Sequence, residues 1–225
     1  MTLGPGGIWR RLYSLRSIRR AMSLARAIGT AAFGAAGGHL GRAVRGHCGF
    51  LAGVEPHPPD SARAREAYDD WRESDALHAG VWDAPFDAVL CADVIEHVTD
   101  PKALLALIRG WLKPGGVLLA SLPNIANISI RLALLFGQFR YTDRGILDGT
   151  HRAFYTRATA GELLKRGGFR VRAVEPTAMP YELAIPRLAR APWTGTTRAL
   201  AQLSAKALPT LFGYQFVFET VKEEF

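Results

Sequence analysis

The chain has 225 residues with a net charge of +8, 48% apolar residues and only two cysteines. This composition excludes a disordered chain, a collagen-like chain and a disulfide-stabilised scaffold, and it predicts a core-forming globular protein. Cys48 and Cys91 have neither a CxxC partner nor a paired His spacing, so no zinc ribbon or oxidised framework is expected and a cytoplasmic location fits best. The apolar stretch Ala27–Gly41 is too short for a bilayer-spanning helix.

The positive charge is concentrated at the start of the chain, because the first acidic residue is Glu55. Arginines there alternate with apolar residues at helical spacing, which predicts a basic amphipathic helix within residues 1–29. Such a helix is suited to docking onto the rest of the chain, and peripheral contact with an anionic membrane surface is the alternative. Charges balance in the remaining chain, so nucleic-acid binding is not expected.

From residue 30 to residue 225, predicted strands and helices alternate, which indicates one doubly wound α/β domain with a mostly parallel sheet. The expected strands are Thr30–Gly34, Phe50–Glu55, Phe86–Ala92, Gly116–Leu122, Phe169–Glu175 and Tyr214–Val221, with a seventh, short strand near Trp71–Asp75. The expected helices are Leu40–Arg45, Ser61–Tyr68, Pro101–Trp111 and Thr159–Arg166. The last strand alternates polar and apolar residues, as an antiparallel strand at or near a sheet edge does.

Two apolar or amphipathic segments, near residues 125–157 and 178–211, interrupt this alternation and are predicted as cap segments. Their composition suits a lid over a greasy acceptor or contact with a membrane surface. Packing on the core or against a second copy of the chain is the plainer interpretation, and the oligomeric state is left open.

A turn of small residues, Gly34–Gly41, follows the first predicted strand. Ligands of doubly wound sheets bind at the carboxyl ends of the strands, where glycine lets backbone amides approach closely. Glu55 ends the second strand 21 residues beyond Gly34, a separation at which an acid accepts hydrogen bonds from both ribose hydroxyls. The pattern predicts a nucleoside-bearing cofactor, either a nicotinamide dinucleotide or S-adenosylmethionine, and a simple packing turn is the structural alternative.

Three later segments favour the second cofactor. Residues Pro85–Pro101 and Leu112–Asn124 closely resemble the fourth- and fifth-strand regions of class I S-adenosylmethionine-dependent methyltransferases. Leu147–Thr156 is similar to the lid of the branch that includes ubiquinone-biosynthesis O-methyltransferases, and the whole resemblance covers residues 34–175 and the last strand. No Tyr is followed by Lys four residues later, so a short-chain NAD-dependent oxidoreductase is only a minor alternative.

The resemblance implies a Rossmann-like methyltransferase fold and a set of cofactor contacts. It implies that Gly34 and Gly38 form the turn under the methionine part and that Glu55 binds the ribose. Asp75 and Ala76 would contact the adenine, and Asp93 would border the same pocket. The family usually has an acid at the position of Ala32 and a glycine at that of Ala36. Losing a charge-assisted contact of ~1.5 to 3 kcal/mol weakens binding about ten- to a hundredfold, so weakened cofactor binding is expected.

Histidine and carboxylate side chains supply the candidate reactive groups. Asp93, Glu96 and His97 are spaced to share one face if they lie on a helix, and His151 follows the fifth strand. The four residues resemble the divalent-metal ligands of ubiquinone-type O-methyltransferases, which implies a possible cation. Without a metal, His97 or His151 is the candidate catalytic base, with Asp148 as the partner of His151.

The sequence therefore predicts an S-adenosylmethionine-dependent methyltransferase that most readily methylates a hydroxyl of a small molecule, a glycan or a lipid-linked acceptor. The competing prediction is a catalytically weak or inactive binding protein that keeps the fold while its glycine turn decays, because Ala32 and Ala36 depart from the family pattern.

Overall fold

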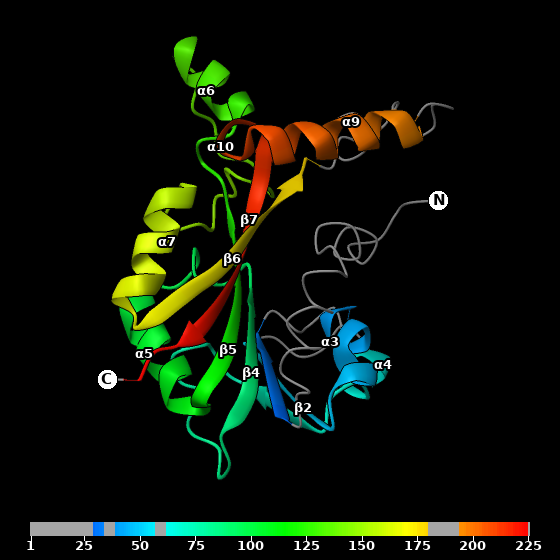
Figure 1. Ribbon diagram of the computed structural model, residues 1–225, viewed down its shortest axis with the longest axis vertical. Coiled ribbons are helices and arrows are strands. Elements are labelled where there is room, and N and C mark those ends of the chain that lie inside the picture. Colours follow the sequence, from blue (N-terminus) through cyan, green and yellow to red (C-terminus); the bar gives the residue numbers. More distant parts are fainter. Residues whose placement is uncertain (1–28, 34–38, 57–61, 180–193, 225) are drawn as a thin grey trace.

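The computed structural model describes residues 29–33, 39–56, 62–179 and 194–224. Seven strands form one sheet in the order β3-β2-β1-β4-β5-β7-β6 (Figure 1). The strands are β1 (Gly29–Phe33), β2 (Phe50–Glu55), β3 (Asp70–Glu73), β4 (Phe86–Ala92), β5 (Leu112–Pro123), β6 (Phe169–Ala178) and β7 (Gly213–Lys222). The expected basic helix within residues 1–29 and the glycine turn at residues 34–38 fall in the ranges that are not described, apart from residue 29.

Strands β1 to β5 are parallel to one another, and β7 runs antiparallel between β5 and β6. The expected antiparallel last strand is therefore confirmed, and it lies next to the edge strand β6. Both faces of β7 are covered, because all its residues from Gln215 to Val221 are buried. A strand inserted antiparallel at this place makes the sheet mixed rather than wholly parallel.

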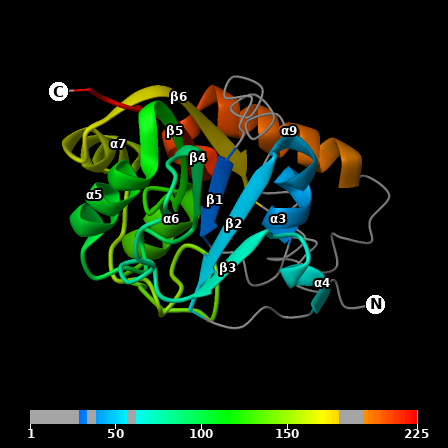
Figure 2. The same cartoon turned by 90° about the horizontal axis from the view of Figure 1, so that it is seen from below.

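Helices cover both faces of the sheet, with α5 and α7 on one side and α3 and α4 on the other (Figure 2). The described helices are α3 (His39–Val44), η1 (Arg45–His47, a 3-10 turn), α4 (Ala62–Arg65), α5 (Pro101–Trp111), α6 (Ile128–Leu135), α7 (Arg157–Arg166), α9 (Thr194–Ala207) and α10 (Pro209–Phe212). Alternate residues of each strand point to opposite faces, and they divide into two apolar clusters, one against α5 and α7 and one against α3.

Helix α5 has the bounds that the sequence predicts, and its capping explains why. The side chain of Asp100 accepts hydrogen bonds from the backbone amides of Lys102 and Ala103, and Pro101 occupies the first turn. Leu104 and Ile108, one turn apart, are fully buried against the sheet. Cap and apolar stripe together fix both the start and the orientation of the helix.

Several observed elements depart from the expected bounds by one to four residues at an end. Strand β3 is Asp70–Glu73, slightly before the expected Trp71–Asp75, and α4 ends at Arg65 instead of Tyr68. Residues 93–97 form a turn, with the His97 amide donating to the Val94 carbonyl, so the expected helical face for Asp93, Glu96 and His97 is wrong. The chain needs a tight turn here because β4 must reverse toward α5 within a few residues.

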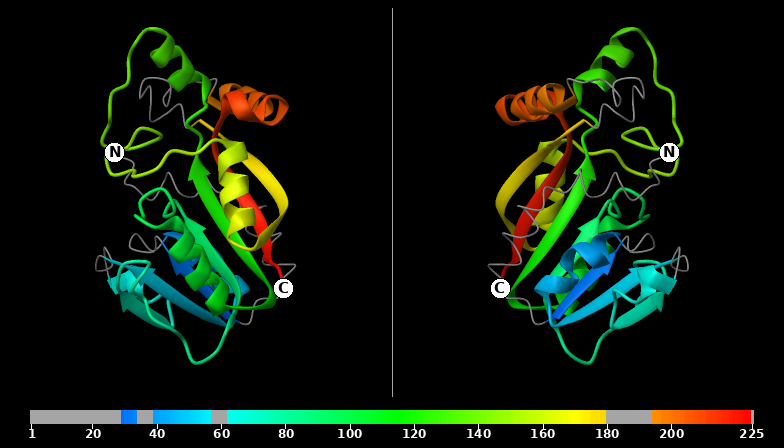
Figure 3. Two further views of the ribbon diagram at one scale, coloured as in Figure 1. Left: turned by 90° about the vertical axis from the view of Figure 1, so that its left-hand side faces the viewer. Right: turned by 90° about the vertical axis from the view of Figure 1, so that its right-hand side faces the viewer.

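The carboxyl ends of the parallel strands point to the end of the molecule where α6, α9 and α10 lie (Figures 1 and 3). Helix α6 belongs to the expected cap segment 125–157. Helix α9 lies within the expected segment 178–211 and α10 extends one residue beyond it, and residues 180–193 of this segment are not described. Within the described ranges, no helix is both long and apolar enough to cross a bilayer.

Candidate functional site

The turn that follows β4 begins at Asp93, whose backbone is left-handed with φ of 53°. A residue other than glycine rarely adopts this conformation, so the surrounding structure must hold it. The Oδ1 atom of Asp93 accepts hydrogen bonds from Ser121 Oγ at 2.6 Å and from Gln215 Nε2 at 3.0 Å. Side chains from β5 and β7 thus anchor the first residue of the turn.

The turn presents Glu96, which is almost fully buried at 1% exposure. Neither carboxylate oxygen has a hydrogen-bond partner among the described residues. A buried carboxylate without partners is costly, and native proteins keep such groups mainly at functional sites. Burial, reinforced by the negative charge of Asp93, raises the pKa of Glu96 well above its ordinary value.

A second loop packs on this turn and brings His151 to Glu96. The backbone amides of Arg152 and Ala153 both donate to the carbonyl of Glu96, at 2.8 and 3.2 Å. The loop is fixed further along by the amide of Ile125, which donates to the carbonyl of Tyr155 at 2.9 Å. Two segments more than fifty residues apart in sequence are therefore joined through main-chain hydrogen bonds.

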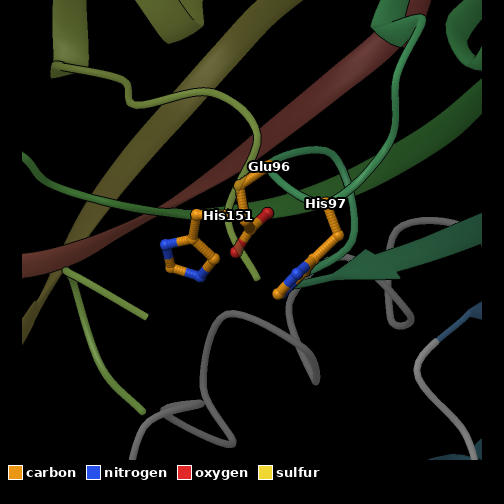
Figure 4. Close-up of side chains that lie close together, drawn as sticks. All are labelled: Glu96, His97 and His151. Carbon is orange, nitrogen blue, oxygen red and sulfur yellow. The ribbon is translucent and has the colours of Figure 1, made fainter. Parts of the chain in front are cut away.

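Figure 4 shows the Glu96 carboxylate between the imidazoles of His97 and His151. The two rings lie edge to face, with centroids 4.7 Å apart and an angle of 70° between their planes. One ligand atom from each of the three side chains lies within 4.8 Å of the others. These three residues are called the Glu96–His97–His151 cluster below.

The protonation of His151 is set by its contact with the main chain. Its Nδ1 atom lies 3.1 Å from the carbonyl oxygen of Ile146, which only accepts hydrogen bonds. Nδ1 must therefore carry the proton, and in the neutral ring Nε2 keeps its lone pair. Partial burial and the neighbouring His97 lower the pKa of His151, which favours the neutral ring.

His97 is oriented through a short relay to Asp148. The hydroxyl of Thr150 donates to Asp148 Oδ1 at 2.6 Å, so its oxygen is left to accept from His97 Nδ1 at 3.1 Å. Nε2 of His97 then also keeps its lone pair. Partial burial acts to raise the pKa of Asp148, but the hydrogen bonds from Thr150 outweigh it and lower that pKa.

This relay changes two expectations about the site. Asp148 bonds to Thr150 and through it to His97, whereas the hydrogen-bond partner of His151 is the Ile146 carbonyl, so the expected Asp148–His151 pair is not formed. Asp93 is not a member of the cluster, and its Oδ1 is directed to Ser121 and Gln215. Three of the four expected metal ligands are therefore together.

The expected cofactor residues lie at the same strand ends, on the side of β1, β2 and β3. Phe33 is in register with Val54, so Glu55 stands beside the point where β1 ends and residues 34–38 begin. Glu55 is half-buried, as an acid that meets a ligand from one side would be. Gly34 and Gly38 themselves fall outside the described ranges.

Asp75 and Ala76 follow β3 in a turn that their own side chains stabilise. The Oδ1 atom of Asp75 accepts from the Leu77 amide at 2.9 Å, and its Oδ2 lies 2.7 Å from Nδ1 of His78. The contact with His78 is the main reason that the pKa of Asp75 is lowered. Ala76 is buried beside this carboxylate, which leaves a small-residue wall next to the end of β3.

Ala32, where an acid was expected, is completely buried in the apolar cluster with Leu40, Leu90 and Ala92. A methyl group satisfies this environment, whereas a carboxylate would lose its hydration there. The departure from the family pattern is therefore matched by apolar packing around this position.

Sequence reasoning missed Ser121, Thr150 and Gln215, which orient the site residues. Thr150 carried a weak signal, since it lies between Asp148 and His151. Gln215 carried none, because it meets Asp93 from a position 122 residues away. Its role depends on β7 lying beside β5, which only the three-dimensional sheet order shows.

Comparison with known proteins places the chain in a family. A family model described as a methyltransferase domain matches residues 33–174, more than half of the chain. The chain is 32% identical over 121 residues to a ubiquinone biosynthesis O-methyltransferase of Xylella fastidiosa (strain M23), and 35% identical over 101 residues to one of Dinoroseobacter shibae. These alignments cover 53% and 44% of this chain but 44% and 40% of the relatives, so the chain matches less than half of their length.

Solved structures agree on the fold. The N-methyltransferase NodS from Bradyrhizobium japonicum WM9, in complex with S-adenosyl-L-homocysteine, superposes with a TM-score of 0.59 at 15% identity, over 98% of this chain and 89% of NodS. A SAM-dependent methyltransferase from Archaeoglobus fulgidus gives a TM-score of 0.61 at 20% identity, over 92% of each chain. The chain thus belongs to the methyltransferase-domain family and has the fold of class I S-adenosylmethionine-dependent methyltransferases.

Proposed function

We propose that the protein transfers a methyl group from S-adenosylmethionine to a hydroxyl group, with His151 as the proton acceptor. The observation that supports this most is the Glu96–His97–His151 cluster. A buried carboxylate without partners among the described residues faces an imidazole whose Nε2 lone pair is preserved by the Ile146 carbonyl. Such an arrangement is suited to removing a proton from an acceptor.

The cofactor half of the site consists of Gly34, Gly38, Glu55 and the Asp75–Ala76 turn, with Asp93 at its border. When bound, S-adenosylmethionine supplies a methyl group activated on a sulfonium. Glu55, at the end of β2 and one residue beyond the pairing of Phe33 with Val54, is placed to accept hydrogen bonds from ribose hydroxyls. The Asp75 turn, held by its bond to His78, offers a rigid wall for the adenine.

The chain's own groups account for the proton that the acceptor loses. Nε2 of His151 takes it up, and Nδ1–H remains bonded to the Ile146 carbonyl, so the ring does not rotate. The Glu96 carboxyl lies beside the ring, and in its ionised form it would stabilise the positive charge that His151 gains, as the acid does in other His–carboxylate pairs. Thr150 and Asp148 keep the neighbouring ring of His97 in place.

The same three side chains fit a divalent cation, and we keep this as a second use of the cluster. Two imidazole Nε2 lone pairs and an unsatisfied buried carboxylate form a ligand set that suits zinc and other transition cations better than magnesium. Such a cation would lower the pKa of the acceptor hydroxyl. Glu96, His97 and His151 would hold it, and Asp93 would remain bonded to Ser121 and Gln215.

The acceptor side of the cluster is aromatic. The rings of Phe154 and His151 have centroids 6.0 Å apart, and Tyr155 lies half-buried in the same loop. This lining favours an acceptor with an apolar or planar part next to its hydroxyl. It is compatible with a small molecule, and equally with a glycan or lipid-linked acceptor that presents such a group.

Turnover assays test the proposal. Formation of S-adenosylhomocysteine is followed with a panel of simple catechols and methyl glycosides, for wild type, His151→Gln and the distant control His47→Gln. Turnover that is lost in His151→Gln, kept in His47→Gln and unaffected by a chelator supports the base. Reversible loss of turnover on chelation assigns the cluster to a cation instead.

The inactive alternative has its own signature in the same experiments. The apolar packing of Ala32 favours it, because it removes the acid that family members place there. A folded wild-type protein that binds neither S-adenosylmethionine nor its demethylated product contradicts the proposed function and supports a non-catalytic binding protein.

A further inference from the structure

Helix α6 and the residues after it carry large apolar side chains that the fold does not bury. Leu135 and Phe136 are 76% and 75% exposed, and Leu132, Leu134, Phe139 and Tyr141 are between 42% and 59% exposed. Ile130 is the buried residue of the helix, and it packs with Ile146 and Leu147. Side chains of this size are seldom left together in solvent unless they bind something.

The charged side chains of residues 101–142 all have one sign. No Asp or Glu occurs between Asp100 and Asp143, and the exposed residues Arg131 and Arg140 flank the apolar run of α6. Arg131 is anchored at its Nε, which donates to the Ala126 carbonyl at 2.7 Å. The surface therefore combines apolar side chains with cations at both borders, and its partner should be anionic and apolar at once.

A neighbouring surface has the same character. Leu200, Leu203 and Leu208 are 55% to 62% exposed on α9 and at the start of α10, and no acidic residue occurs in Thr194–Phe212. Figures 1 and 3 place α6 and α9 at the same end of the molecule, beyond the carboxyl ends of the strands. One end of the protein is thus apolar and basic.

We infer that this end of the protein, centred on residues 131–141, binds an anionic lipid surface. A bilayer interface offers both parts of the complement, since acyl chains accept Leu135 and Phe136 while lipid phosphates face Arg131 and Arg140. A second copy of the chain is a poorer partner. In a symmetric pair the same patch faces itself, which places the arginines of one copy near those of the other.

The inferred lipid surface leads to the candidate site through aromatic rings. The ring centroids of Phe139 and Phe154 are 6.1 Å apart, and those of Phe154 and His151 are 6.0 Å apart. An acceptor held in the membrane would meet these rings on its way to the cluster. This step alone rests on the proposed function, whereas lipid binding itself is independent of turnover.

Vesicle co-flotation of the full chain tests the inference. The probes are vesicles of phosphatidylcholine, with and without phosphatidylglycerol. We expect the wild type to bind the mixed vesicles with an affinity that falls as salt is added. The affinity should be about tenfold or more lower in Leu135→Ser/Phe136→Ser and unchanged in the distant control Val81→Ser. Val81 is 78% exposed and lies in the loop that leads into the amino end of β4, whereas the inferred lipid surface lies beyond the carboxyl ends of the strands.

Charge variants separate the role of the arginines. Replacing Arg131 and Arg140 by Gln should weaken binding to the mixed vesicles about 25-fold, since each basic group near an anionic surface is worth about a fivefold change. The Lys double variant at these positions should retain most of the binding, and Gln at both Arg170 and Arg172, which are exposed on β6, should change nothing.

Three results would overturn the inference. They are absence of binding to either vesicle by the wild type, binding that the Leu135→Ser/Phe136→Ser variant retains, and a lipid-free dimer that dissociates in this variant. Circular dichroism melting of every variant confirms that losses of binding are not losses of folding. Unchanged methyl transfer to a water-soluble acceptor in Leu135→Ser/Phe136→Ser would show that lipid binding and the proposed methyl transfer are independent of each other.

Discussion

The two halves of the strand-end surface are built differently. Strands β1 and β2 are mostly small and apolar, with Ala31, Ala32 and Ala52 fully buried, and the acids Glu55 and Asp75 follow at or beyond the ends of β2 and β3. Around β4, β5 and β7 polar side chains penetrate the interior, and they bond to one another across three strands. The first half is suited to recognising a ligand and the second to moving a proton.

The difference shows where the protein accepts an energetic cost. Burying Glu96 without a partner, and holding Asp93 in a left-handed conformation, both oppose folding. In the cofactor half, the buried polar atoms without a hydrogen-bond partner among the described residues, Thr30 Oγ1, Tyr68 Oη and Trp71 Nε1, belong to neutral side chains, which cost less to bury than a carboxylate. Costs of this kind persist when function requires them. Variants near Glu96 should therefore change the rate of methyl transfer, and variants in the cofactor half should change the binding of the cofactor.

The largest effect is expected for His151→Gln. A general base contributes about 10²- to 10⁴-fold to the rate, so turnover should fall by that factor while binding of S-adenosylhomocysteine stays the same. In wild type, the neutral ring is the active form, and burial lowers its pKa. Activity should therefore rise with pH through an ionisation below about 6.5, and this limb should be absent in His151→Gln. Equal activity of variant and wild type at all pH values would exclude the base.

The next effect is on binding. Glu55→Gln removes the charge proposed to hold the ribose, and calorimetry should show about 10- to 100-fold weaker binding of S-adenosylhomocysteine, with folding intact. Glu66→Gln, an exposed acid in the turn after α4, serves as the control. If Glu55→Gln binds like wild type, the cofactor lies elsewhere.

These two predictions rest on features of different origin. Local signals were sufficient for the framework: β4 and α5 have the predicted bounds because Asp100 and Pro101 cap the helix and the strand is apolar apart from Asp87. Glu96, His97 and His151 were named from residue type, spacing and family resemblance. The orienting groups were not, since the Ile146 carbonyl, Thr150 and Gln215 act through hydrogen bonds that depend on how distant segments pack. The shared helical face considered for Asp93, Glu96 and His97 does not form, because a left-handed residue starts a turn at this point.

A third effect concerns stability. The pKa of Glu96 is raised in the folded protein, so the folded state binds this proton more tightly than the unfolded state does. The free energy of unfolding should then fall by up to ~1.4 kcal/mol per pH unit as pH rises above the ordinary Glu value of about 4.3, and level off above the folded-state pKa. Glu96→Gln should lack this decline in metal-free denaturant titrations. An identical decline in the variant would show that Glu96 is not its source.

The smallest effect is expected for Thr150→Val, which removes the link between Asp148 and His97. Second-layer partners of functional histidines contribute about tenfold or somewhat more. Turnover should drop by about that factor in Thr150→Val, and Thr150→Ser, which keeps the hydroxyl, should restore it. A matching loss in both variants would mean that the methyl group of Thr150 matters for packing and that its hydroxyl relays nothing.

The most direct test of the account is a calorimetric titration of folded wild-type protein with S-adenosylhomocysteine, repeated with His151→Gln. The account predicts saturable one-to-one binding with a dissociation constant below about 1 mM, equal in both proteins, because recognition resides in the cofactor half. The absence of binding by wild type, or an equally large loss in His151→Gln as in Glu55→Gln, would contradict the division of the site into these two halves.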